Sequence, residues 1–340
     1  MKTLKLALMG FGNCGRAFAE MLMQKQPDII ERYNTEVLVS VITTRSRGNL
    51  VNPGGINLAR ALEELKEKGR FKSDVSSKGA QEIIETEDYD VLVEMTPLNI
   101  FTAEPATTYI RTAFARGRHV ISANKGPVAW HYRELRNEAQ DKGLCFFHET
   151  VVMDGAPVFN LVENTLKLAK VTEISGILNS TTNFILEELA RGCEYDDIIS
   201  RGREMGFIEE DSAMDIEGYD AAGKITALAN VLMDADLTPE MVDRKGIEDI
   251  TIEDIRQADA RGKVIKLICR CALENGKAKA YVRPEEIDKA DLLASINSTT
   301  SIVSITTDLM KKTSIVEHEP EIEQTAYGVF GDVLRVIENE

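Results

Sequence analysis

Short apolar runs alternate with amphipathic segments through the first 150 residues. The strand-like runs are Leu4–Met9, Glu36–Ile42, Val91–Met95, His119–Ser122 and Leu144–Phe147. Between them stand helical patterns at Arg16–Gln24, Leu58–Lys68, Thr102–Arg116 and Val128–Asp141. Strands that alternate with helices in this way are typical of a parallel, doubly wound sheet. We therefore predict an α/β protein whose residues 1–150 form a Rossmann-type domain.

The pattern changes after about residue 150. Helical periodicity covers Pro157–Leu166, Asn183–Arg191, Tyr195–Met205 and Gly218–Asp236, and strand-like runs cover Val171–Leu178, Val264–Ala272 and Ala278–Val282. This mixture predicts a second, α+β domain over residues 151–320. A final amphipathic helix follows at Ala326–Ile337. We expect residues 321–340 to complete the first domain.

Composition and charge narrow the classes of function. The 340 residues are 43% apolar and carry 40 basic and 56 acidic side chains, a net charge of −16. Such a charge repels phosphate backbones and acidic membrane surfaces, so we expect neither nucleic acid nor a membrane as a partner. No signal peptide or membrane span is visible. The five cysteines show no C-x-x-C spacing, which fits structural thiols and a cytoplasmic location.

A glycine-rich turn follows the first predicted strand. Its sequence, Gly10-Phe11-Gly12-Asn13-Cys14-Gly15, matches G-x-G-x-x-G and opens a predicted helix. In dinucleotide-binding domains the first glycine allows the tight turn, the second admits the pyrophosphate and the third lets helix and strand pack closely. The alternative is a plain strand-to-helix turn. We expect a cofactor site here that includes Asn13 and Cys14.

The end of the second strand bears on the choice of cofactor. No acidic residue stands there to bind the ribose hydroxyls of NAD, whereas Arg45 and Arg47 are suited to a 2′-phosphate. The alternative is two solvated arginines in a loop. We favour NADP and keep NAD as possible. Thr96, Asn124 and Lys125 are further expected contacts, and the last two directly follow the fourth strand, where ligands of such sheets bind.

An acidic segment precedes a helix without charges. Six acids stand within residues 209–220, and residues 225–233 that follow carry no charge. Lys224 and Asp220 are four residues apart on this helix, which the apolar continuation predicts to be buried. A partly buried lysine beside a carboxylate is suited to proton transfer, while the alternative is an exposed helical ion pair. We expect the pair to be catalytic.

The segment Gly176–Asn183 ends a predicted strand and begins a helix. We expect Ser180 or Thr181 to be its N-cap, and the N–H groups of this turn could also hold a substrate. The four histidines have no metal-ligand spacing.

Several motifs, which together extend over nearly the whole chain, resemble those of one family. GFGNCG, the segments 119–129 and 148–158, GILNSTTNFIL at 176–186 and the acidic segment 206–224 are similar to those of homoserine dehydrogenase, in a short form without a C-terminal regulatory domain. The resemblance implies NAD(P)-dependent interconversion of L-homoserine and L-aspartate 4-semialdehyde, in threonine and methionine biosynthesis. It also implies a homodimer formed through the second domain.

The resemblance carries roles to individual residues. Lys224 and Lys125 correspond to catalytic lysines, and Asp220 to the acid that orients Lys224. The expected substrate contacts are Glu209, Asp215, Ser180 and Thr181, and the main-chain oxygens of Glu149, Val152, Asp154 and Ala156 are expected to hold Na⁺ or K⁺. Ser180, Ser212 and Asp154 depart from the family pattern. Two alternatives stay open: an NADP-dependent dehydrogenase of another amino acid, and a non-catalytic NADP-binding paralogue.

Overall fold

The backbone forms two compact units. The computed structural model describes residues 1–205, 208 and 212–339. One unit, here the N-terminal unit, combines Met1–Pro157 with Glu321–Glu340; the other, the central unit, is Val158–Pro320. The chain thus leaves the first unit after Pro157 and returns to it with its last helix.

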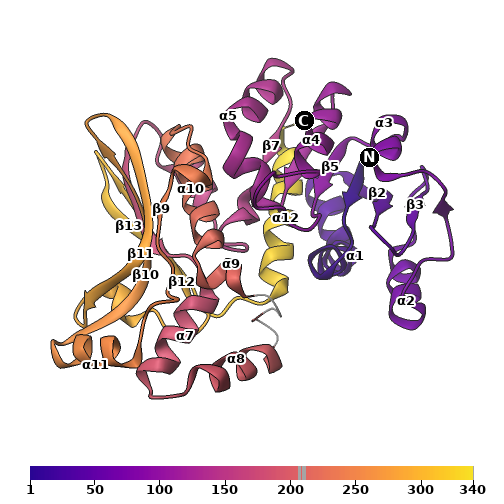
Figure 1. The fold of residues 1–340 in the computed structure, drawn as a ribbon. Coiled ribbons are helices and arrows are strands. Elements are labelled where there is room, and N and C mark those ends of the chain that lie inside the picture. The colour runs from indigo at the N-terminus through magenta and orange to yellow at the C-terminus, as the bar shows by residue number, and fades with distance from the viewer. Residues whose placement is uncertain (206–207, 209–211, 340) are drawn as a thin grey trace. The chain divides into compact units, whose positions relative to one another are not determined.

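The N-terminal unit is built on a seven-stranded sheet in the order β4-β3-β2-β1-β5-β6-β7 (Figure 1). Strands β2, β1, β5, β6 and β7 pair in parallel, while β3 and β4 add an antiparallel edge. The predicted doubly wound, mostly parallel sheet is confirmed. The strands are β1 (Lys2–Met9), β2 (Thr35–Thr43), β3 (Asn49–Val51), β4 (Val75–Ser76), β5 (Val91–Glu94), β6 (His119–Ser122) and β7 (Phe146–Phe147).

Helices cover both faces of this sheet. They are α1 (Asn13–Tyr33), α2 (Leu58–Lys68), α3 (Ala80–Thr86), α4 (Ala106–Ala115), α5 (Lys125–Asp141) and α12 (Ile322–Asn339), with a 3₁₀ turn η1 at Glu149–Val151. One hydrophobic cluster joins Phe18 of α1 and Val329 of α12 to β1 and β2. A second joins Ile110 of α4 and Leu135 of α5 to the opposite face. In Figure 1 the yellow α12 lies beside the indigo α1, so both chain ends contribute to one core.

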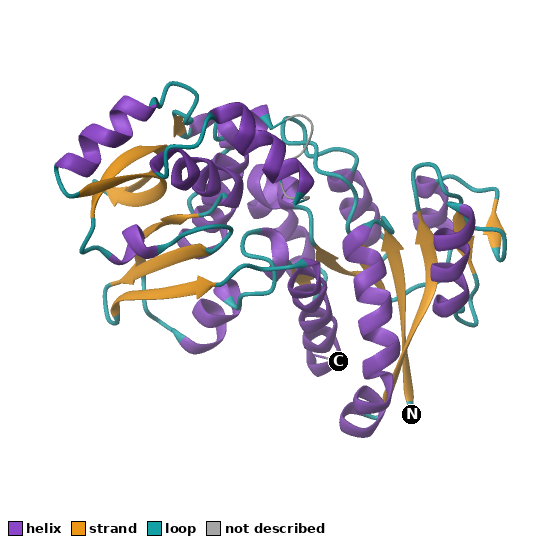
Figure 2. Cartoon of the chain, turned by 90° about the horizontal axis from the view of Figure 1, so that it is seen from below, coloured by secondary structure: helices purple, strands orange, loops and turns teal. Residues whose placement is uncertain are grey.

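The central unit contains a six-stranded sheet in the order β13-β12-β8-β10-β11-β9. Figure 2 draws all strands in orange. Neighbouring strands of this sheet pair antiparallel, except for β11 and β9, which pair in parallel. The strands are β8 (Val171–Ile177), β9 (Asp243–Arg244), β10 (Lys263–Glu274), β11 (Lys277–Asp288), β12 (Ser301–Thr307) and β13 (Lys311–Glu317). The sequence analysis did not predict β12 and β13. Gly176 permits the close approach of β12, because a Cβ there would lie 2.1 Å from the carbonyl oxygen of Ile302.

The helices of the central unit include three that pack on its sheet, α7, α10 and α11. The helical elements are α6 (Val158–Asn160), η2 (Leu161–Thr165), α7 (Ser180–Ala190), α8 (Tyr195–Glu204), α9 (Ala213–Ile216), α10 (Tyr219–Met233), η3 (Pro239–Met241), α11 (Ile252–Ala260) and η4 (Leu292–Ser295). Among the described residues, no helix combines the length and the apolar character needed to span a membrane. Cys269 and Cys271 lie buried in β10, and burial raises their thiol pKa values to about 12 and about 11, so both are structural thiols.

Candidate active site

The glycine turn has the geometry that a dinucleotide requires. Gly10 adopts a φ of +98°, and a Cβ there would lie 2.4 Å from the carbonyl oxygen of Met95. Gly12 faces open space, with no atom within 4 Å of a Cβ built on it. Gly15 lies so close to the turn that its Cβ would be 3.0 Å from the Gly10 oxygen. Helix α1 begins at Asn13 with no acid in its first turn, so its N–H groups suit a pyrophosphate.

The loop after β2 folds back on itself. The hydroxyl of Thr44 accepts a hydrogen bond from the backbone N–H of Arg47 at 2.9 Å and donates to the Gly48 oxygen at 2.7 Å. Arg45 is exposed in this turn and Arg47 is half-buried. The short strand β3 follows this turn and pairs with β2. The two arginines therefore stand on a turn held between paired strands.

A buried carboxylate connects the ends of β5 and β6. Glu94 is fully buried and accepts hydrogen bonds from the backbone N–H of Thr96, at 3.0 Å, and from its hydroxyl. The Asn124 amide donates to the Thr96 carbonyl at 3.1 Å, and its oxygen caps α5 by accepting from Gly126 N–H at 3.0 Å. Lys125 is the first residue of that helix. Glu94, which was not predicted from the sequence, thus holds Thr96, and Asn124 links Thr96 to the start of α5.

Burial raises the pKa of Glu94 to about 7, although its hydrogen bonds with Thr96 oppose the shift. Its only sequence signal was an acid at the end of an otherwise apolar strand.

The central unit brings Asp220 and Lys224 together on α10. Their side chains are 16% and 20% exposed, and Lys224 Nζ lies 3.5 Å from Asp220 Oδ2. Lys224 Nζ also donates to the carbonyl oxygen of Leu178 at 2.8 Å. The prediction of a partly buried pair is confirmed, and a surface ion pair is ruled out. The pair lies against the end of β8.

Asn179 joins a second carboxylate to this pair. Its amide nitrogen donates to Asp215 Oδ1 at 2.7 Å and to Asp220 Oδ2 at 3.0 Å. Its amide oxygen accepts from Thr182 N–H at 2.8 Å and caps α7. The prediction of Ser180 or Thr181 as N-cap is therefore wrong. The helix already begins at Ser180, so the cap must be the residue before it.

The remaining predicted residues fall into three groups. Ser180 and Thr181 form the first turn of α7, half-buried and buried respectively. Glu209 lies outside the described residues. Lys125 belongs to the N-terminal unit, where it is the first residue of α5.

The loop predicted to hold a monovalent cation is fixed by α12. Glu149 N–H donates to Asp332 Oδ2 at 2.9 Å, and the hydroxyl of Thr325 donates to Asp154 Oδ1 at 2.6 Å. Asp154 has a φ of +41°. Within the described ranges, no cluster of His, Cys, Asp and Glu side chains could hold a metal ion. A main-chain ion site at Glu149, Val152, Asp154 and Ala156 stays a prediction.

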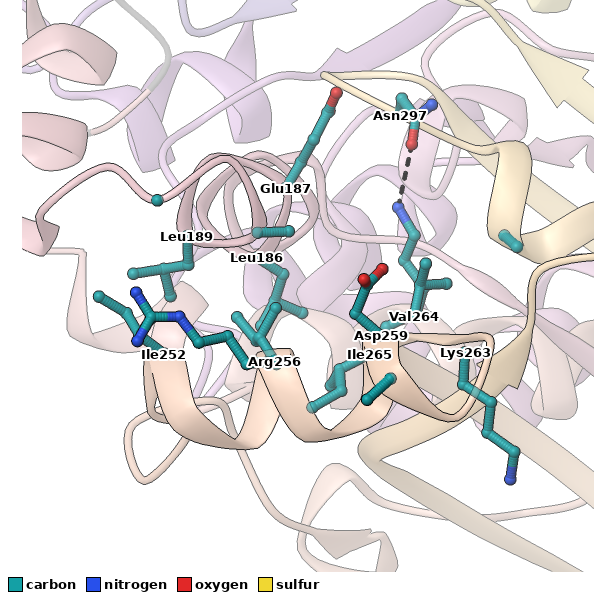
Figure 3. A pocket seen from close by; sticks show the side chains of 16 residues that line it. Leu186, Glu187, Leu189, Ile252, Arg256, Asp259, Lys263, Val264, Ile265 and Asn297 are labelled. Atoms are coloured by element: carbon teal, nitrogen blue, oxygen red, sulfur yellow. Dashed lines mark hydrogen bonds between the residues drawn. The ribbon is translucent and has the colours of Figure 1, made fainter.

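A separate pocket of about 280 Å³ lies between α7, α11 and the start of β10 (Figure 3). Buried Lys266 lines it and donates to Asn183 Oδ1 at 2.8 Å and to Asn297 Oδ1 at 3.4 Å. Burial lowers the pKa of Lys266 to about 8. None of the candidate residues lines this pocket. Lys266 serves there to tie α7 to the segment around Asn297.

Two family models match successive parts of the chain. The model of the homoserine dehydrogenase NAD-binding domain matches residues 10–149, and the homoserine dehydrogenase model matches residues 157–334. The chain belongs to the homoserine dehydrogenase family. Members of this family are NAD(P)-dependent oxidoreductases that act on a CH–OH group of a small amino acid, in amino-acid biosynthesis. The family predicted from the motifs is confirmed.

Relatives cover the chain from end to end. A homoserine dehydrogenase of Methanocaldococcus jannaschii is 33% identical, over 98% of each chain. An NAD(+)-dependent homoserine dehydrogenase of Pseudomonas canavaninivorans is 32% identical, over 99% of this chain and 97% of the relative. The structure of a hyperthermophilic archaeal homoserine dehydrogenase in complex with NADPH has a TM-score of 0.85 and 26% identity, over 99% and 98% of the two chains.

Glu94→Gln should change how stability depends on pH. Folding raises the pKa of Glu94 from 4.5 to about 7, so the folded protein binds more protons than the unfolded chain between these values. As pH rises from about 4.5 to about 7, the free energy of unfolding of the wild type should therefore fall relative to that of the variant. The fall is at most about 3 kcal/mol. Urea unfolding of both proteins at pH 5, 6, 7 and 8 measures this difference.

Glu63→Gln on the exposed face of α2 is the matched control, for which we expect a difference that does not vary with pH. A wild-type minus Glu94→Gln difference that is equally constant would contradict the buried-carboxylate assignment.

Proposed function

We propose that this member of the homoserine dehydrogenase family interconverts L-homoserine and L-aspartate 4-semialdehyde at the Asp215–Asn179–Asp220–Lys224 cluster, with NADP as its preferred cofactor. The observation that carries the proposal is the half-buried Lys224, which is paired with the Asp220 carboxylate. The amide of Asn179 joins Asp220 to a second carboxylate, that of Asp215. Such a cluster supplies both a proton-transfer group and an anionic partner for an ammonium ion.

The carboxylates account for an amino acid substrate. The ammonium group of homoserine needs a negative partner, and the resemblance to the family assigns this role to Asp215, a carboxylate of the cluster. Glu209 is proposed as a second partner on the resemblance alone. The first-turn N–H groups of α7, at Ser180 and Thr181, are suited to the substrate carboxylate. This arrangement favours a zwitterion over a simple alcohol.

We assign the transfer of the substrate's hydroxyl proton to Lys224. When bound, the nicotinamide supplies the hydride acceptor for oxidation and the hydride donor for reduction. The hydroxyl proton of homoserine must leave as the carbonyl forms, and we assign its uptake to the neutral amine form of Lys224, which thereby becomes an ammonium. In the reverse direction the same ammonium stabilises and protonates the developing alkoxide. Asp220 holds Lys224 from one turn earlier on α10, and Lys125 is the alternative proton donor.

The cofactor preference rests on Arg45 and Arg47. One related protein is named as NAD(+)-dependent, and the structure of another is named as a complex with NADPH. Membership of the family therefore leaves the choice between NAD and NADP open. The turn after β2 carries two guanidinium groups and no carboxylate, which favours a 2′-phosphate over ribose hydroxyls alone. Gly10, Gly12, Asn13, Cys14 and Gly15 would hold the pyrophosphate, with Thr96, Asn124 and Lys125 as further contacts.

Three further expectations belong to the same proposal. They are a homodimer formed through the central unit, a Na⁺ or K⁺ ion held by main-chain oxygens of the 149–156 loop, and a cytoplasmic location. Asp154 favours the ion because its positive φ and its bond with Thr325 give this loop a fixed shape.

The direct test is the absorbance at 340 nm of purified protein with L-homoserine and NADP or NAD in separate reactions. We expect reduction of NADP with homoserine and none with serine, threonine or aspartate. Turnover of another amino acid in place of homoserine would favour a different dehydrogenase. Binding of NADPH without any turnover would favour a non-catalytic paralogue.

Lys224→Ala should abolish most activity. Loss of the group that exchanges the hydroxyl proton is expected to lower kcat by about 10²–10⁴-fold while NADPH binding is retained. Lys277→Ala, at the exposed first residue of β11, is the control and should behave as wild type. Steady-state kinetics and a fluorescence titration with NADPH measure both. Near-normal turnover by Lys224→Ala would remove this residue from the mechanism.

Replacing Arg45 and Arg47 together by alanine should separate the two cofactors. We expect kcat/KM for NADP to fall by about 10–10²-fold, because two charge-assisted contacts to the 2′-phosphate are lost. The value for NAD should stay within about twofold, so NAD serves as the internal control. An equal fall with both cofactors would mean that the loop, and not the phosphate, was affected.

A further inference from the structure

Asn179 stands where the two candidate carboxylates meet. It is 5% exposed and is the second residue after the end of β8. We propose that the Asn179 amide is the positioning residue that sets the distance between Asp215 and Asp220 and thereby orients Lys224. The inference rests on the proposed function of that cluster and names no contact of Asn179 with the substrate.

The orientation of the amide follows from its donors and acceptors. Thr182 N–H can only donate, and it lies 2.8 Å from Asn179 Oδ1. The Thr182 hydroxyl lies 2.9 Å from the same oxygen. The amide oxygen is therefore committed to the first turn of α7, and the NH₂ group must point to the opposite side. This side is the one on which both carboxylates lie.

The two N–H groups of the amide match two carboxylate oxygens. The amide nitrogen lies 2.7 Å from Asp215 Oδ1 and 3.0 Å from Asp220 Oδ2, so it donates to both. Two carboxylates this close repel each other unless donors separate them, and a neutral amide is the donor that neither adds nor removes charge. Asp215 comes from α9 and Asp220 from α10, so the amide also fixes one helix against the other.

The same strand end holds the lysine. Lys224 Nζ donates to the carbonyl oxygen of Leu178, the residue before Asn179, and lies 3.5 Å from the Asp220 oxygen that Asn179 contacts. Two consecutive residues after β8 therefore determine both members of the Asp220–Lys224 pair. A shift of Asn179 therefore moves the Asp220 oxygen that faces Lys224 Nζ, and with it the direction in which the lysine is held.

Asn179→Asp separates positioning from capping. Aspartate has the same shape and is an equally good N-cap, so the start of α7 should be preserved. The variant loses both N–H donors and places a third carboxylate beside Asp215 and Asp220. Asn57→Asp is the matched control, because Asn57 is an exposed N-cap whose side chain accepts from Arg60 N–H. Asn179→Ser is a second variant that keeps a capping hydroxyl but cannot reach the carboxylates.

We expect Asn179→Asp to lower kcat/KM for homoserine by about 10²-fold, with both KM and kcat affected. NADPH affinity and the content of helix should stay at wild-type values. The acidic limb of the pH profile of kcat/KM should also move to higher pH, because a third negative charge raises the pKa of its neighbours. Among the residues that the structure describes, the charged or titratable groups around Asn179 are Asp215 from α9, Asp220 and Lys224 from α10, and Cys269 from β10. Asn57→Asp should leave every value unchanged.

The possible outcomes are distinct. If both variants at Asn179 fold and retain the kcat/KM and pH profile of wild type, the positioning role is overturned while the proposed function stands. Loss of activity accompanied by loss of α7, seen also in Asn179→Ser, would assign Asn179 a structural role and overturn the proposal. If wild type itself does not oxidise homoserine, the proposed function fails. Crystal structures of wild type and Asn179→Asp would then still test the inference, since unchanged positions of Asp215 and Asp220 would refute it.

Discussion

The end of β8 is the constraint on which the candidate active site depends. Leu178 accepts from Lys224, Asn179 donates to Asp215 and Asp220, and the same asparagine begins α7. Buried charges are tolerated only when they are paired or hydrogen-bonded. Two residues that directly follow β8 meet this requirement for Asp215, Asp220 and Lys224.

The N-terminal unit uses the same device at its own strand ends. Asn124 follows β6 as Asn179 follows β8, and each caps a helix with its oxygen while its nitrogen holds a neighbouring segment. In the first case the neighbour is Thr96, which is also held by buried Glu94. An asparagine is suited to this position because one side chain carries an acceptor for the helix and two donors for another partner. Helix starts and site residues are thereby linked in both units.

The closure of the N-terminal unit adds a second condition. Helix α12 packs with α1 in one hydrophobic cluster, and its fully buried Asp332 accepts from Glu149 N–H at the start of the 149–156 loop. Burial raises the pKa of Asp332 to about 7. The shape of this loop therefore depends on residues more than 170 positions away along the chain, such as Thr325 for Asp154.

The sequence by itself determined the fold class, the glycine turn, the Asp220–Lys224 pair and the family, because each depends on residues close together in the chain. A period of 3.6 places residues 220 and 224 on one face, and the G-x-G-x-x-G spacing acts within six residues. The sequence pattern did not predict β12 and β13, because serines and threonines interrupt their apolar residues. These segments are strands because β12 pairs with β8 and β13 pairs with β12. The sequence analysis placed the cap of α7 one or two residues too late, and it missed Glu94 and the second role of Asn179. Only the tertiary structure decided these points, because hydrogen bonds between β8, α9 and α10 join residues about 40 positions apart, and no local pattern encodes such contacts.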